Sequence, residues 1–243
     1  MAETVALITG ANKGIGLETA RQLGGQGITV LIGARDAAKG EQAAADLKAE
    51  GITAYAVTVD VTDTTSVAAA VSKVEAQFGK LDILVNNAGV LADRDATAST
   101  VSDTLVRQTF ETNVFGLIHT TQAFLPLLRK SEAGRIVNLT SILGSITFAA
   151  DPASPIGGGT GSGSIYAASK AAVNMYTVHL ATELKDTPIK VNAVHPGWVK
   201  TEMGGEGAMM EIEDGAKTSV QYATIGADGP TGGYFHFGEK FPW

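Results

Sequence analysis

The 243-residue chain contains no cysteine, so it can form neither a disulfide nor a thiolate nucleophile or metal ligand. Its four histidines, at positions 119, 179, 195 and 236, lack the spacing of a metal site. We therefore expect chemistry that needs no metal.

The sequence also lacks an apolar run long enough to span a bilayer, and its first predicted strand begins too close to Met1 to leave room for a secretory leader. A net charge of −7 with no basic patch disfavours nucleic acid as a partner. These absences predict a soluble, cytoplasmic protein. With 44% hydrophobic residues and no low-complexity tract, the chain can bury a sizeable core as a single domain.

Short β-rich runs alternate along the chain with segments of helical periodicity, which predicts right-handed crossovers onto a parallel sheet. Several of the runs are apolar nearly throughout, as in strands that helices cover on both faces. We predict an α/β fold, a doubly wound (Rossmann-type) seven-stranded parallel sheet. The predicted strands are Thr4–Thr9, Ile28–Gly33, Ala54–Val59, Ile83–Asn86, Arg135–Leu139, Lys190–His195 and Tyr234–Phe237.

A glycine-rich turn follows the first predicted strand. Glycines at such a turn let the backbone approach a pyrophosphate, whose charge then lies at the start of the next helix. The spacing differs from the common G-x-G-x-x-G pattern, and a plain tight turn is the alternative. The predicted dinucleotide-binding residues here are Gly10, Asn12, Lys13, Gly14, Ile15 and Gly16.

Basic residues indicate which dinucleotide binds. Arg35 follows the second predicted strand, where an NAD-binding chain usually presents a carboxylate to the ribose. A guanidinium there can make a forked contact with a 2′-phosphate, and Lys13 could add a second positive charge. We predict NADPH/NADP+ in preference to NADH. The alternative, that both are ordinary surface charges, gains some weight from the adjacent Asp36.

Tyr166 and Lys170 are four residues apart, so they project from the same face of one helix. A cation close to a phenol favours its charged form and lowers its pKa, which would let Tyr166 donate a proton near neutral pH. Taken alone, the same spacing also describes an ordinary amphipathic pair.

Together these motifs resemble those of the short-chain dehydrogenase/reductase family, in the family's order and over nearly the whole chain. The segments Asn12-Lys13, Ala34-Arg35 and Pro196–Thr201 are most similar to the family's NADPH-dependent carbonyl reductases. The motifs that carry the resemblance are Thr9–Gly16, Asn86-Asn87-Ala88-Gly89, Asn113, Ser141, Tyr166 with Lys170, and Pro196-Gly197.

The resemblance implies four catalytic residues. Ser141 would hold the substrate carbonyl, and Tyr166 would protonate it while the nicotinamide delivers hydride. Lys170 would lower the pKa of Tyr166 and bind the nicotinamide ribose. Asn113, in a helix predicted from about Ser102 to Leu128, would hold a water that relays protons, or is a helix-bend asparagine.

The resemblance also implies the rest of the cofactor site. The adenine contact would come from Asp60 with Val61, although Asp60 or Asp63 could instead cap the next helix. Asn87 and Gly89 fit both a turn role and a cofactor role, and His195 reads as a packed strand-end residue. The implied cofactor residues are Asp60, Val61, Asn87, Ala88, Gly89, Tyr166, Lys170, Pro196, Gly197, Val199 and Thr201.

The chain departs from the family between Ser141 and Tyr166, where residues 142–165 form an interval about twice the usual length. We predict a flexible Gly/Ser-rich loop over Asp151–Ser164 at the substrate mouth. A homo-oligomer, dimer or tetramer, is expected, although longer insertions accompany loss of subunit contacts in carbonyl reductases. The domain would divide into a cofactor part, about 1–140, and substrate loops, about 142–164 and 198–217.

The second of these loops, residues 198–217, is called the lid below, and it is acidic. Between Lys200 and Lys217 it should repel large anionic substrates, which favours small neutral ketones or aldehydes. Met209 and Met210 are pocket or core residues. The lid acids are Glu202, Glu206, Glu211, Glu213 and Asp214, and the predicted substrate pocket comprises Ile142, Leu143, Trp198 and Met203.

The sequence thus predicts an NADPH-dependent oxidoreductase that reversibly reduces a small neutral carbonyl compound to an alcohol. The alternatives are a redox-sensing regulator that binds NADP(H) without turnover, and a reductase of acyl-carrier-bound 3-oxoacids, which the acidic lid disfavours. A sugar-nucleotide epimerase or dehydratase would usually need a longer chain.

Overall fold

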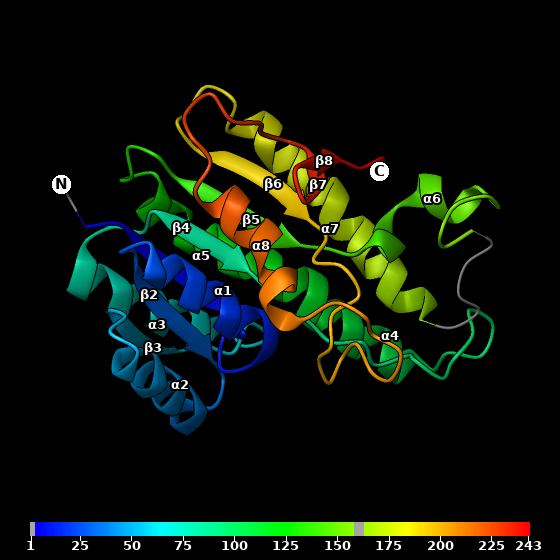
Figure 1. Cartoon of the computed structure of the whole chain (residues 1–243), viewed down its shortest axis with the longest axis horizontal. Coiled ribbons are helices and arrows are strands. Elements are labelled where there is room, and N and C mark those ends of the chain that lie inside the picture. The colour runs from blue at the N-terminus through cyan, green and yellow to red at the C-terminus, as the bar shows by residue number, and fades with distance from the viewer. Residues whose placement is uncertain (1–2, 158–162) are drawn as a thin grey trace.

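The computed structural model describes residues 3–157 and 163–243 and contains one eight-stranded sheet, ordered β3-β2-β1-β4-β5-β6-β7-β8 (Figure 1). Strands β1 to β7 are parallel, and each lies within one residue of its predicted position. The eighth strand, which pairs antiparallel with β7, was not predicted. The strands are β1 Val5–Thr9, β2 Thr29–Ala34, β3 Ala54–Thr58, β4 Ile83–Asn86, β5 Arg135–Leu139, β6 Lys190–Val194, β7 Tyr234–His236 and β8 Glu239–Lys240.

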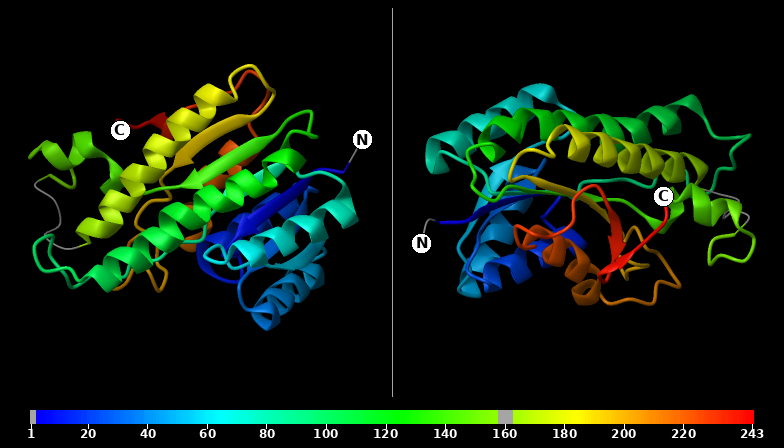
Figure 2. Two further views of the ribbon diagram at one scale, coloured as in Figure 1. Left: turned by 180° about the vertical axis from the view of Figure 1, so that it is seen from behind. Right: turned by 90° about the horizontal axis from the view of Figure 1, so that it is seen from above.

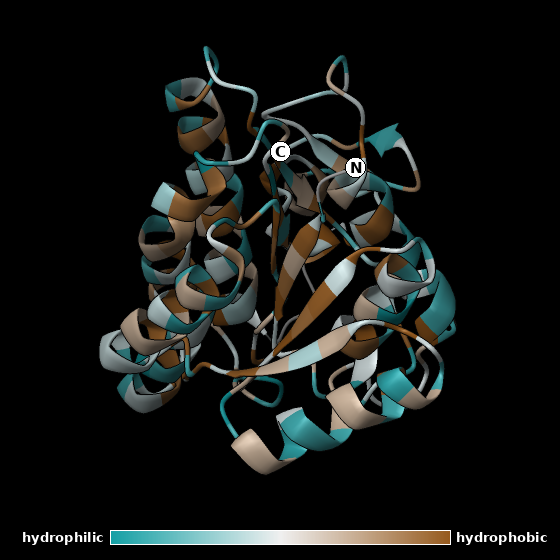
Figure 3. Cartoon of the chain, turned by 90° about the vertical axis from the view of Figure 1, so that its left-hand side faces the viewer, coloured by the Kyte–Doolittle hydropathy of each residue, from teal (hydrophilic) through white to brown (hydrophobic). Residues whose placement is uncertain are grey.

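Helices cover both faces of the sheet, as Figure 2 shows from above. Helices α1, α2 and α8 contribute to one apolar core, and α3, α5 and α7 to the other. Both cores lie against the hydrophobic strands, while hydrophilic residues gather on the outer helix surfaces (Figure 3). The helices are α1 Gly14–Gly25, α2 Ala37–Ala49, α3 Thr64–Phe78, α4 Asp103–Phe110, α5 Leu117–Leu128, α6 Ile146–Ala150, α7 Ser164–Glu183 and α8 Ile212–Ala223, with a π-helical segment Glu111–Gly116 and a 3₁₀ turn Ile142–Gly144.

The strand order reverses at β1, which pairs with β2 on one side and β4 on the other. Ligands of open parallel sheets bind beyond the carboxyl ends of the strands at such a switch point. The loops that carry the predicted site follow β1, β4, β5 and β6, so the topology brings them to one edge of the sheet.

The predicted helix from about Ser102 to Leu128 is present as α4, the π-helical segment and α5 in succession. Ser102 caps its start by accepting a hydrogen bond from the Leu105 N–H at 3.4 Å. The π-helical segment, which the sequence did not indicate, contains Asn113. Single π-helical turns inside α-helices are frequent at functional sites.

A 3₁₀ turn and α6 form the first part of the segment after Ser141, before the predicted flexible loop begins at Asp151. Ser164 belongs to α7 and not to a loop, and residues 158–162 of the predicted flexible loop lie outside the described residues. The C-terminal residues pack on this segment: Ser145 Oγ donates to the Pro242 carbonyl, and the Thr147 N–H donates to that of Trp243, both at 2.9 Å.

No helix within residues 3–157 and 163–243 is long and apolar enough to cross a membrane. Over the same ranges, no group of three or more His, Asp or Glu side chains gathers as it would to hold a metal ion.

Candidate active site

Helix α7 places Tyr166 and Lys170 side by side in a nearly water-free environment. Their exposed fractions are 9% and 4%. Lys170 Nζ lies 5.6 Å from the centroid of the Tyr166 ring and donates a hydrogen bond to the Leu139 carbonyl at the end of β5, at 2.9 Å. The ammonium is thus fixed beneath the phenol by the backbone of the sheet.

The prediction that Lys170 lowers the pKa of Tyr166 is wrong for this structure. Burial raises the pKa of Tyr166 to about 12, and a hydrogen bond with the Ser141 side chain opposes that rise. Burial also lowers the pKa of Lys170 to about 8, so its amine still carries most of its positive charge at neutral pH. The phenol therefore holds its proton firmly, as a proton donor in carbonyl reduction must before it meets substrate.

Ser141 follows β5 and begins the 3₁₀ turn, where its hydroxyl accepts a hydrogen bond from the Leu143 N–H at 3.2 Å. The turn fits closely on α7 through Gly144, since a Cβ on that glycine would lie 2.8 Å from Lys170 Cβ. This close approach brings the Ser141 hydroxyl to the Tyr166 phenol, and both groups can then meet the same substrate oxygen.

Asn113 is 1% exposed and uses its side chain to hold the loop after β4. Its Oδ1 accepts from the Val90 N–H at 2.8 Å, and its Nδ2 donates to the Val90 carbonyl at 2.9 Å and to Ser169 Oγ at 3.0 Å. The amide is thus committed to a backbone segment and to α7. These contacts show a positioning role for the side chain, and the water relay remains a prediction.

The loop after β1 has the geometry of a phosphate cradle. Gly10 and Gly14 adopt positive φ angles of 64° and 59°. A Cβ on Gly16 would lie 2.4 Å from Asn87 Nδ2, which donates to the carbonyls of Thr9 and Gly10 at 2.8 and 3.2 Å. Asn87 therefore ties the loop after β4 to the glycine turn, and side chains larger than glycine do not fit between them.

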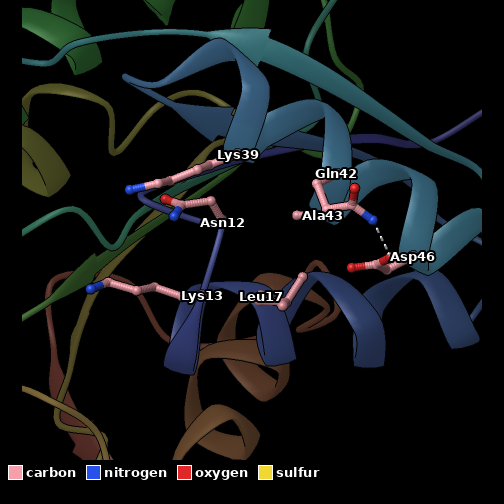
Figure 4. Close-up of a pocket in the computed structure, with 7 residues that line it drawn as sticks. All are labelled: Asn12, Lys13, Leu17, Lys39, Gln42, Ala43 and Asp46. Atoms are coloured by element: carbon pink, nitrogen blue, oxygen red, sulfur yellow. Dashed lines mark hydrogen bonds between the residues drawn. The ribbon is translucent and has the colours of Figure 1, made fainter.

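The start of α1 fits an anion as well. No side chain caps it, and its first turn contains no acidic residue. Beside it opens a cavity of about 330 Å³ in which Asn12, Lys13 and Lys39 direct their polar ends to the same side (Figure 4). Lys39 was not predicted, although a basic residue four positions after Arg35, near the start of α2, was a readable signal. Lys13 forms an ion pair with Glu202 of the lid.

The other predicted cofactor residues lie around the same edge of the sheet. Arg35 is exposed directly after β2. Asp60 follows β3 and accepts from the Thr62 N–H at 2.9 Å, whereas Asp63 caps α3 by accepting from Thr65 N–H at 2.8 Å. Asp63 is therefore the helix cap, which leaves Asp60 with Val61 for the predicted adenine contact.

The segment after β6 turns at Gly197, whose φ is +96° and where a Cβ would lie 2.5 Å from Met210 Sδ. Val199 is buried and pairs with Met210 in an isolated β-bridge. Thr201 Oγ1 accepts from the Gly204 N–H at 3.0 Å and lies near Gly14 of the cofactor loop. The lid, which follows Pro196 and Gly197, thus folds back against the glycine turn, whose Gly10 packs on Ala88.

The predicted substrate residues divide into two groups. Ile142 and Leu143 are half-buried beside Ser141, whereas Trp198 and Met203 are 53% and 39% exposed on the lid. Met209 is 79% exposed, so the core alternative for this residue is wrong, and its place in a substrate pocket stays a prediction.

His195 is a packed strand-end residue, as the sequence predicted. Burial and the neighbouring His236 lower its pKa to about 3, so the ring is neutral. Its Nδ1 accepts hydrogen bonds from the N–H groups of Ile142 and Gly197, at 3.3 and 3.4 Å. The ring therefore links the Ser141 segment with the start of the lid.

Comparisons with known proteins agree with this geometry. The chain is 39% identical over 227 residues to the short-chain dehydrogenase anuI of Penicillium roqueforti, covering 92% of this chain and 89% of that protein. It is 33% identical over 224 residues to the 3-oxoacyl-[acyl-carrier-protein] reductase FabG of Staphylococcus aureus, covering 92% and 85%.

Among solved structures, the NADPH-bound carbonyl reductase from chicken fatty liver superposes with a TM-score of 0.86, at 26% identity over the whole of both chains. The family model described as short chain dehydrogenase matches residues 4–211. The chain is therefore a member of the short-chain dehydrogenase/reductase family, oxidoreductases that bind a nicotinamide cofactor and act on small molecules.

Proposed function

We propose that the protein is an NADPH-dependent reductase that reversibly converts a small neutral ketone or aldehyde to an alcohol. The observation that carries this proposal is the placement of the Ser141 side chain beside the phenol of a Tyr166 that retains its proton, with Lys170 one turn away. A hydroxyl that can bind a carbonyl oxygen and a phenol that can protonate it meet at one point.

The bound cofactor would supply hydride from its nicotinamide ring. Ser141 would orient the substrate carbonyl oxygen by a hydrogen bond, and Tyr166 would give that oxygen its phenolic proton as negative charge develops on it. Lys170, between the Leu139 carbonyl and Gly89, would hold the ribose and return a proton to the phenol. Asn113 would keep the loop after β4 in place beside them.

The preference for NADPH rests on positive charge around the glycine turn. Lys13 and Lys39 line the same cavity, and Arg35 is exposed directly after β2. Glu202 forms an ion pair with Lys13, and a 2′-phosphate would compete with this carboxylate for the Lys13 ammonium. The chicken carbonyl reductase, whose structure holds NADPH, supports the same preference.

The acidic lid supports a neutral substrate. Glu211 pairs with Lys200 and Asp214 with Lys217, so both lid lysines are already neutralised. Glu206 and Glu213 remain without such pairs among the described residues, and a negatively charged acyl carrier would meet them. The similarity to FabG favours a 3-oxoacyl substrate nevertheless, so that class belongs in any assay.

We retain the homo-oligomer and the division into cofactor and substrate parts as predictions.

The deciding experiment is the Tyr166→Phe substitution, with Tyr176→Phe on the same helix as the matched control. The purified proteins are incubated with NADPH or NADH and a panel of aryl ketones, keto esters, aldehydes and a 3-oxoacyl thioester, and nicotinamide absorbance is followed. Tyr166→Phe should lower kcat by at least ~10²-fold and leave the Kd for NADPH unchanged, because it removes the acid and keeps the ring.

Two results contradict the proposal. Near-normal turnover of Tyr166→Phe would show that the Tyr166 phenol is not the proton donor. Tight NADPH binding by the unmodified protein without oxidation across the panel would favour the redox-sensing regulator instead.

A further inference from the structure

Asp93 is a carboxylate buried completely in the loop between β4 and α4. Its exposed fraction is 0%. No lysine or arginine in the described part of the chain forms an ion pair with it. A buried charge without a counter-ion is costly unless hydrogen bonds compensate it, so its partners identify what it does.

Among the described residues, the partners of its carboxylate lie at the start of α7, the helix that carries Tyr166 and Lys170. The Ile165 N–H donates to Asp93 Oδ2 at 2.7 Å, and the Tyr166 N–H donates to Asp93 Oδ1 at 3.3 Å. The Gly163 N–H donates to the Asp93 backbone carbonyl at 3.1 Å. The residue therefore meets the unpaired N–H groups of the first helical turn, where the helix dipole also favours a negative charge.

The helix has no such group of its own. The residue at the N-cap position is Gly163, with a φ of +70° and no side chain that could cap the helix, and the first turn contains no acid. Most helices take their cap from the residue immediately before them. Here the capping carboxylate comes from a residue 72 positions away in the sequence.

The backbone of Tyr166 is fixed on both sides. Its N–H donates to Asp93, and its carbonyl accepts from Ser169 Oγ at 2.6 Å. Ser169 Oγ in turn accepts from Asn113, which also holds both backbone polar groups of Val90. The loop that carries Asp93 is thus anchored to the π-helical segment at Val90 and to α7 at Asp93.

We infer that Asp93 is a positioning residue for the reaction: it holds the backbone of Tyr166 where the phenol reaches Ser141 and the substrate oxygen. The inference rests on the proposed function for its catalytic consequence. Replacing one carboxylate oxygen with an NH₂ group would place a donor against a helix N–H and remove the charge that faces the dipole. The first turn of α7 would then loosen and Tyr166 would lose its alignment, while the cofactor loop would be untouched.

The test compares Asp93→Asn with Asp95→Asn, the same substitution two residues on at an exposed position. Asp93→Asn should lower kcat at least ~10-fold, since misplacement of a reacting group is costly. The Kd for NADPH, from quenching of its fluorescence, should stay within about twofold. Asp95→Asn should match the unmodified protein in both. Amide hydrogen exchange, followed by mass spectrometry, should accelerate at the start of α7 in Asp93→Asn alone.

Three results would overturn the inference: a kcat for Asp93→Asn within twofold of the unmodified protein, an equal loss in Asp95→Asn, or a rise in the Kd for NADPH that accounts for the whole effect. If Asp93→Asn does not fold, Asp93→Ser takes its place, because its hydroxyl can still accept one N–H. The same criteria then apply.

Failure of the proposed function is distinguishable from failure of the inference. If the unmodified protein reduces no carbonyl compound, the exchange measurement still tests whether Asp93 holds α7. Spectrophotometric titration of Tyr166, taken as the difference from the Tyr166→Phe form, gives a second readout. Its pKa should fall in Asp93→Asn, because burial raises this pKa and the phenol becomes more exposed when the first turn of α7 loosens. An unchanged titration together with unchanged exchange would refute the positioning role.

Discussion

The cofactor side and the substrate side of this molecule are built by different means. Around the glycine turn, backbone atoms approach so closely that a Cβ on Gly16 would lie 2.8 Å from the Gly10 carbonyl oxygen, and one on Gly33 2.7 Å from that of Ile8. On the substrate side, Ile146 and Met209 are 70% and 79% exposed. The backbone around the glycine turn is therefore fixed by close packing, whereas the side chains of the proposed substrate side have room to vary.

Adding one methyl group at Gly16 should have the largest effect, because its Cβ would lie 2.4 Å from Asn87 Nδ2 inside the glycine turn. Gly16→Ala should raise the Kd for NADPH about 10²-fold, or about 3 kcal/mol, by forcing Asn87 away from the glycine turn. Gly25→Ala is the matched control, since a Cβ at that end of α1 meets nothing within 4 Å. Fluorescence titration measures both variants, and equal affinities would show that the turn is more compliant than its geometry indicates.

The second prediction concerns His195, which joins two segments of the substrate side. The pKa of His195 is about 3 in the folded protein and 6.5 ordinarily, so between these pH values the unfolded chain binds a proton at this residue and the folded chain does not. Its stabilising contribution is therefore complete above about pH 6.5 and is lost as the pH falls toward 3. Between pH 8 and pH 5 this loss amounts to about 2 kcal/mol.

His195→Asn keeps an acceptor near the two backbone N–H groups and removes the titration. Urea unfolding at pH 8 and pH 5 should show a smaller loss of stability for this variant than for the unmodified protein. His119→Asn, at an exposed position on α5, is the control and should keep the full pH dependence. The same loss in all three proteins would mean that folding does not lower the pKa of His195.

Sequence alone predicted the seven parallel strands and the loops that follow them, because their signals are local, but it missed the short β8. Apolar runs and glycine turns determine where a parallel strand ends, and the fold then brings Ser141 and Tyr166 together. What it missed depends on contacts between distant residues. Asp93 reaches α7 across 72 positions, and Lys39 joins Lys13 through the placement of α2. The raised pKa of Tyr166 follows from burial, which the four-residue spacing to Lys170 does not reveal.

Substitutions of the exposed basic residues should have smaller effects on NADPH than Gly16→Ala, because water and salt screen exposed charges. Arg35→Ala should raise the KM for NADPH about tenfold and leave that for NADH nearly unchanged, since only NADPH carries the 2′-phosphate. Lys39→Ala should do the same more weakly. Arg107→Ala, an exposed arginine of α4 that pairs with Asp103, controls for a general loss of positive charge. Equal changes for both cofactors would reject the assignment of Arg35.

The smallest effect is expected at Trp198, whose indole N–H donates to the Gly204 carbonyl at 3.0 Å within the lid while half of the ring faces solvent. Trp198→Ala should raise the KM for an aryl ketone about threefold, because little apolar surface is removed from water when substrate meets an exposed ring. The Kd for NADPH should not change, since the ring has no part in the packing of the glycine turn. Trp198→Phe retains apolar area without the N–H, so recovery of KM in that variant would assign the effect to the ring face. The contrary outcome is that Trp198→Ala weakens NADPH binding as much as substrate binding. That result would show that the lid contributes to cofactor binding, so the cofactor side would extend beyond β5 to include the lid.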